Sequence, residues 1–162
     1  MKTVIVYHSR FGHTRRLAEA MAEQLAPKGT ARAIATDQVT PADLHGADLV
    51  VMGSPTHRMR LPEEVRPLFD ALPRKCLRGA AVAAFDTSYR MNRFLARFTA
   101  AKTLDRKLRK LGGKRIVPPE TFFVAGREAP LEDGEIERAR AWAERLVAAA
   151  AHALKEEKRG GK

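Results

Sequence analysis

The sequence predicts an α/β fold: a doubly wound, five-stranded parallel sheet with helices on both faces. Two observations carry this prediction. Strand-like and helix-like segments alternate five times along the 162 residues, and such alternation builds a parallel sheet with crossover helices. The first strand-like run is apolar throughout, as expected of a strand covered on both faces. Five such units suit the strand order 2-1-3-4-5, which places the first strand in the middle.

The strands are predicted from short apolar or β-branched runs. They are expected at 4–7, 31–35, 48–53 and 80–85, followed by a fifth strand at 115–117 and 121–124. Pro118 and Pro119 interrupt this fifth strand. Because a proline cannot donate to the hydrogen-bond ladder, the pair favours an edge position, which the order 2-1-3-4-5 provides.

The helices are predicted from apolar residues at helical spacing. The first runs from Thr14 to Leu25, and a short turn follows Pro41. A third helix is expected to begin with Pro62 at its N1 position and an acidic first turn. A long basic helix is expected over 93–110, ended by a glycine pair, with a buried face of Phe94, Phe98, Ala101, Leu104, Leu108 and Leu111. The last helix should bury Ile136, Ala139, Trp142, Ala143, Leu146, Val147 and Ala150.

Length and composition favour a cytoplasmic protein with one domain over 1–154 and a frayed basic tail over 155–162. No apolar run reaches the roughly 18 residues of a membrane span. The N-terminus lacks the pattern of a secretory signal. Cys76 is the single cysteine, which excludes an internal disulfide.

The charge balance is strongly basic, with 30 Lys and Arg against 19 Asp and Glu and a formal net charge of +11. Such an excess indicates an acidic partner, such as a nucleic acid, an acidic protein or an anionic membrane surface, or else a solvated helix face. Since Phe94 and Phe98 are expected on a buried face, no aromatic side chains would interleave with the basic ones for base stacking. Sequence-specific nucleic-acid binding is therefore not expected.

Three loops should form the functional site, because ligands of this fold bind beyond the carboxyl ends of the strands, between strands 1 and 3. The first loop meets a helix N-terminus, whose free N–H groups bind phosphate. Gly12 allows close backbone approach, and Ser9 and Thr14 offer hydroxyls that can bind an anion or cap the helix. The loop consists of Ser9, Arg10, Phe11, Gly12, His13 and Thr14.

The other two loops can surround a planar ring. The second is polar and free of carboxylates, and its backbone can wrap one edge of a ring through Pro55, Thr56, His57 and Arg58. The third offers hydroxyls and an aromatic side chain that can cover a ring face, through Asp86, Thr87, Ser88 and Tyr89.

The chain lacks the residues that other functions of related folds require. A response-regulator receiver needs acidic residues after strands 1 and 3, where this chain has His8-Ser9 and Gly53-Ser54. A low-molecular-weight tyrosine phosphatase needs a cysteine in the first loop, and Cys76 is far from it. The first loop matches neither the dinucleotide fingerprint nor the Walker motif. No His or Cys cluster has metal spacing.

The chain resembles the flavodoxin family over nearly its whole length. The resemblance is carried by Ser9-Arg10-Phe11-Gly12-His13-Thr14, by Gly53-Ser54-Pro55-Thr56 and by the five βα units. The family's phosphate loop is typically Ser/Thr-x-Thr-Gly-x-Thr, so Phe11 replaces the middle threonine. Quinone-reductase-type flavodoxin-like proteins, with a Ser-x-x-Gly-His pattern, are more similar. The fifth strand carries no long insertion, as in short-chain flavodoxins.

The resemblance implies an FMN-binding electron-transfer protein. It places the phosphate at residues 9–14 and the isoalloxazine ring between Pro55–Arg58 and Asp86–Tyr89. Flavodoxins are generally acidic, so the basic charge here departs from the family and implies a different partner, one that is acidic. Arg10, His57, Arg58, Arg60 and Arg90 are expected to make transfer of the second electron easier, since a positive field favours the more anionic flavin.

Two alternatives stay open on the sequence. One is an NAD(P)H-dependent, FMN-containing reductase of quinone-like substrates, whose arginines would hold a nucleotide phosphate. The other is a flavin-free binding module that uses the basic 93–110 helix. In each flavin-based hypothesis the flavin carries the chemistry, so no residue is assigned as a catalytic acid, base or nucleophile.

Overall fold

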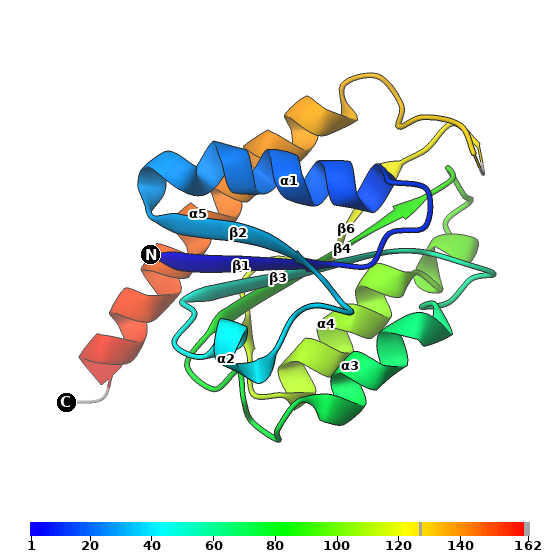
Figure 1. The fold of residues 1–162 in the computed structure, drawn as a ribbon. Helices are drawn as coiled ribbons and strands as arrows, with labels where there is room; N and C mark the ends of the chain where they lie inside the picture. The colour runs from blue at the N-terminus through cyan, green and yellow to red at the C-terminus, as the bar shows by residue number, and fades with distance from the viewer. Residues whose placement is uncertain (127, 161–162) are drawn as a thin grey trace.

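The fold is a parallel sheet covered by helices on both faces (Figure 1). The computed structural model describes residues 1–126 and 128–160. The sheet has the order β2-β1-β3-β4-β5, and β6 also pairs with β4, which confirms the predicted architecture. The strands are β1 (Lys2–Tyr7), β2 (Thr30–Ala35), β3 (Leu49–Pro55), β4 (Ala81–Ser88), β5 (Lys114–Arg115) and β6 (Glu120–Phe123).

The two proline residues divide the last strand as expected. β5 pairs with Ala81 and Val82 at the start of β4, and β6 pairs with the last four residues of β4, from Phe85 to Ser88. The segment between them contains Pro118 and Pro119, which cannot donate to the ladder. This arrangement carries the end of β6 to the same edge of the sheet as the end of β4.

The helices form two layers. α1 (His13–Leu25) and α5 (Glu135–Gly160) cover one face, and α2 (Pro41–Leu44), α3 (Arg66–Ala71) and α4 (Ala100–Lys110) cover the other (Figure 1). Along β1, Ile5 belongs to the core beneath α1 and α5, whereas Val4 and Val6 belong to the core beneath the other layer. Burial on both faces explains why this strand is apolar at consecutive positions.

The third helix differs from its prediction at the start. Pro62 has an extended ψ of 140° and precedes a 3₁₀ turn over Glu63–Val65, and α3 begins only at Arg66. Pro67 occupies the first turn of α3. The N1 assignment of Pro62 is therefore wrong, because a second proline five residues later starts the α-helix.

The long basic helix predicted over 93–110 is broken. Leu95–Arg97 form a separate 3₁₀ turn, Thr99 is extended, and α4 begins at Ala100. The N–H groups of Ala100 and Ala101 donate to side chains at the ends of β3 and β4 rather than to carbonyls of a preceding turn. Consequently Phe94 and Phe98, predicted on a buried face, are 64% and 52% exposed, so their burial is no longer a reason to exclude base stacking.

The C-terminal helix buries the predicted apolar face against α1 and the sheet, with Trp142, Ala143 and Leu146 in the core. It continues to Gly160. The frayed tail over 155–162 stays a prediction, and residues 161–162 lie outside the described part of the chain. Among the helices that the structure describes, none combines the length and the apolar character needed to cross a membrane.

Candidate functional site

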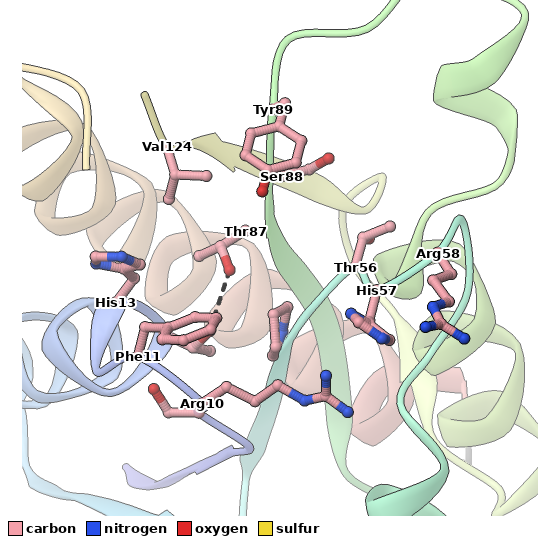
Figure 2. Close-up of a pocket in the computed structure, with 13 residues that line it drawn as sticks. Arg10, Phe11, His13, Thr56, His57, Arg58, Thr87, Ser88, Tyr89 and Val124 are labelled. Carbon is pink, nitrogen blue, oxygen red and sulfur yellow. Dashed lines mark hydrogen bonds between the residues drawn. The ribbon is translucent and has the colours of Figure 1, made fainter. Parts of the chain in front are cut away.

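A cavity of about 280 Å³ opens at the carboxyl ends of β1, β3 and β4 (Figure 2). The three predicted loops meet there. Every residue expected at the site lines the cavity except Gly12 and Asp86, and Val124 lines it in addition. The lining consists of Ser9, Arg10, Phe11, His13, Thr14, Pro55, Thr56, His57, Arg58, Thr87, Ser88, Tyr89 and Val124.

The first loop presents backbone donors to one end of the cavity. Gly12, the N-cap of α1, has a φ of +88°, a conformation that glycine adopts without a steric penalty. Its N–H donates to Ser9 Oγ at 3.1 Å, which closes the loop, while the Ser9 hydroxyl proton stays available to a ligand. Since α1 begins at His13, the first N–H groups of the helix have no acceptor within it. The N–H of Arg15 donates to Ser9 Oγ at 3.4 Å, and those of His13 and Thr14 precede it. This geometry suits an anion.

His13 adds a polar atom without a partner. Its Nε2 is buried and makes no hydrogen bond in the structure, although the side chain lines the cavity. A buried polar atom without a partner is costly, so His13 has hydrogen-bonding capacity that the described residues leave unused beside the cavity. His8 Nε2 is also unpartnered, but His8 borders a neighbouring hollow, and burial lowers its pKa.

The second loop makes a tight turn that brings a cation to the cavity. His57 and Arg60 exchange backbone hydrogen bonds at 3.0 Å in both directions. The two residues between them, Arg58 and Met59, have φ of +48° and +63°, as in a type I′ turn, where Asn and Gly are usual. Arg58 lines the cavity, whereas Arg60 lies in an adjacent hollow that Arg10 also borders.

The third loop joins the other two. Thr87 Oγ1 lies 3.3 Å from Thr14 Oγ1, and the Thr87 carbonyl accepts the N–H of Thr56 at 2.9 Å. Tyr89 stands at the mouth, 45% exposed, on the other side of the cavity from Phe11 (Figure 2). Aromatic side chains thus frame the opening.

Asp86 lies behind the lining rather than in it. It is fully buried, and its Oδ2 accepts the Thr56 hydroxyl at 2.7 Å and the N–H of Ala101 at 3.2 Å. Burial raises the pKa of this carboxyl, and the hydrogen bonds from Thr121 and Thr56 oppose that rise only in part. Asp86 therefore supports a lining residue.

Two positions differ from what the sequence indicated. Val124, which follows β6, reaches the cavity because β6 pairs with the end of β4; the prediction of an edge strand gave no reason to expect this. Arg90, expected near the ring, is outside the lining. Its guanidinium pairs with Glu132 at 2.8 Å and lies over the Phe123 ring, 4.3 Å from the centroid.

A doubly wound parallel sheet with a helix N-terminus and an adjoining cavity at the topological switch point is the arrangement found in nucleotide-binding α/β proteins. The flavodoxin family profile, described as "Flavodoxin", matches residues 5–142. The chain therefore belongs to the flavodoxin family, whose members bind FMN and transfer electrons.

Solved flavodoxins share this fold. A flavodoxin from the domain Archaea superposes with a TM-score of 0.73 at 20% identity, covering 94% of this chain and all of that one. The oxidised flavodoxin 1 of Bacillus cereus superposes with a TM-score of 0.73 at 19% identity, and the match covers 91% of this chain and 98% of that one.

Among curated proteins, an NAD(P)H dehydrogenase (quinone) of Gluconacetobacter diazotrophicus is 26% identical over 109 residues. That match spans about half of each chain, 54% of this one and 55% of the dehydrogenase.

Proposed function

We propose that the cavity is the FMN site and that the protein shuttles electrons to an acidic redox partner in the cytoplasm. The unpartnered His13 Nε2 beside the open N-terminus of α1 carries the assignment, because together they offer a phosphate several donors. The phosphate would lie on residues 9–14, and the ring between Pro55–Arg58 and Thr87–Tyr89. When bound, FMN supplies the electron transfer.

The protein's part is to hold and tune this cofactor. Phe11 and Tyr89 offer aromatic surface on two sides of the cavity (Figure 2). Arg58 brings positive charge to the lining, which favours a more anionic flavin. Phe11 replaces a hydroxyl donor of the family's loop with apolar surface, so the backbone N–H groups and His13 carry more of the phosphate binding.

The net charge of the protein favours an acidic partner. A protein of net charge +11 repels basic partners and attracts acidic ones at long range. The cytoplasmic location agrees with the single half-buried Cys76, since disulfides are characteristic of oxidising compartments.

Titration of the flavin-free protein with FMN and with riboflavin tests the cofactor assignment. Riboflavin lacks the phosphate, so we expect FMN to bind at least about tenfold more tightly, a difference of about 1.4 kcal/mol. His13→Ala should weaken FMN binding but leave riboflavin binding nearly unchanged. Arg74→Gln is the matched control, because Arg74 precedes the start of β4, at the end of the sheet opposite the cavity. Equal affinities for the two flavins, or no uptake of either, would overturn the proposal.

A second candidate is NAD(P)H-dependent reduction of quinone-like substrates. The partial match to an NAD(P)H dehydrogenase (quinone) favours it, as do Arg58 and Arg60, which border a hollow beside the cavity that Glu63 and Glu64 also line. Steady-state turnover with NAD(P)H and a soluble quinone separates the two, since a shuttle shows almost none. A colourless protein that takes up no FMN would instead favour the flavin-free module.

A further inference from the structure

Residues 89–98, here called the rim segment, expose apolar side chains that the cavity does not explain. Phe94, Leu95 and Phe98 are 64%, 38% and 52% exposed. None of the three lines the cavity, so a ligand there would leave them in water. The segment joins the end of β4 to the start of α4, and so it lies at the edge of the sheet where the cavity opens.

The rim segment has a defined shape. Asn92 Oδ1 accepts, at 2.9 Å, the N–H of Leu95, the first residue of the 3₁₀ turn. The rings of Phe94 and Phe98 meet edge to face with centroids 5.9 Å apart. Lys102 Nζ donates to the Ala96 carbonyl at 2.9 Å. These contacts hold two aromatic rings together on the surface, where they form a preorganised contact patch.

The charged residues of this stretch are all basic. Arg93, Arg97 and Lys102 are basic, Arg90 is paired with Glu132, and the sequence has no acidic residue from Thr87 to Leu104. Arg93 and Arg97 flank the two phenylalanines and are exposed. A surface complementary to this segment therefore carries carboxylates around an apolar centre.

We propose that the rim segment is the docking surface for the acidic redox protein of the proposed function, on which this inference rests. Its side chains are mainly Tyr, Arg, Met and Phe, the types enriched in protein interfaces, whereas Lys, Glu, Asp and Ser are absent from 89–98. Membrane-surface binding usually needs an amphipathic helix, and this segment contains a single 3₁₀ turn. Docking here places the partner beside Tyr89 at the cavity mouth.

The test measures equilibrium binding of an acidic plant-type ferredoxin to the full chain by titration calorimetry, with and without added FMN. We expect binding at about 0.01 M ionic strength that weakens strongly by about 0.15 M. Arg93→Gln with Arg97→Gln, and separately Phe94→Ser with Phe98→Ser, should each raise the Kd by about tenfold or more. Arg74→Gln with Arg78→Gln removes the same charge from exposed residues at the opposite edge and should change the Kd by less than about twofold.

The proposal fails if the ferredoxin does not bind at low ionic strength. It also fails if the two arginine pairs have equal effects, because net charge alone would then explain binding. Tighter binding to vesicles of phosphatidylglycerol and phosphatidylcholine, lost in the phenylalanine variant, would make the segment a membrane contact instead. Because the apo protein is titrated too, failure to bind FMN is seen separately from failure to dock.

Discussion

The hydroxyl of Thr56 donates to Oδ2 of Asp86 at 2.7 Å, and the same oxygen of Thr56 accepts the N–H of Ala100 at 2.8 Å. This pair links the end of β3, the end of β4 and the first turn of α4. Thr56 lines the cavity and Asp86 does not. The relationship thus couples the shape of the site to a buried carboxyl.

Removing the Thr56 hydroxyl should destabilise the fold. Thr56→Val keeps the shape but leaves Asp86 Oδ2 and the N–H of Ala100 each short of a partner, so we expect a loss of about 1–3 kcal/mol in the free energy of unfolding. Urea denaturation measures it. Thr30→Val, at an exposed strand position, should change stability by less than about 0.5 kcal/mol. Equal losses in both variants would contradict the role of the pair.

Asp86 should make stability depend on pH. Burial raises the folded-state pKa of Asp86 above the ordinary value of 3.8. Its favourable contribution to the free energy of unfolding is therefore complete below pH 3.8 and is lost as the pH rises through the folded-state pKa. The unfolding free energy of the wild type minus that of Asp86→Asn should therefore fall as the pH rises above about 4. Other carboxyl groups act on both proteins and cancel. A difference that is flat or rises with pH would show that Asp86 is ionised without penalty.

Arg58 should tune the flavin potential. Arg10 is paired with Glu64 at 2.6 Å and Arg90 with Glu132, whereas the ion pairs within residues 1–126 and 128–160 include neither Arg58 nor Arg60. Arg58→Gln should make the potential for the second electron more negative, on the order of 20–50 mV. Spectroelectrochemical titration of the FMN-loaded protein checks this. The distant Arg74→Gln should not move it, and an unchanged potential in Arg58→Gln would remove Arg58 from this role.

The positive φ values of Arg58 and Met59 should cost stability. Replacing them with Asn and Gly, the pair that a type I′ turn favours, should raise the free energy of unfolding by about 1 kcal/mol. Arg58→Gln is the matched control, because it removes the same charge but keeps a side chain that disfavours positive φ. If both variants are equally stable, the turn holds no strain.

The sequence predicted the strand order and most of the cavity because both follow from local signals. Apolar runs locate the strands, and the carboxyl ends of β1, β3 and β4 necessarily meet at one edge. Gly12 and Ser9 mark a loop whose geometry depends on neighbouring residues alone. The site residues that loops provide were therefore visible in advance, although their binding of FMN stays a prediction.

Phe94 and Phe98 show what local pattern misses. Their spacing continues the apolar face of α4, yet both are exposed. The N–H groups at the start of α4 are claimed by Thr56 and Asp86, which come from distant strands, so the helix cannot extend back to residue 94.

Amino-acid order alone thus determined the elements, the sheet and the loops that meet at the cavity, because periodicity and turn residues act over a few positions. Tertiary structure decided where α4 begins, that Asp86 lies behind the cavity wall, that Arg90 turns to Glu132, and that Val124 enters the lining. Each depends on hydrogen bonds, ion pairs or strand pairing between segments far apart in the chain, which local sequence patterns do not encode.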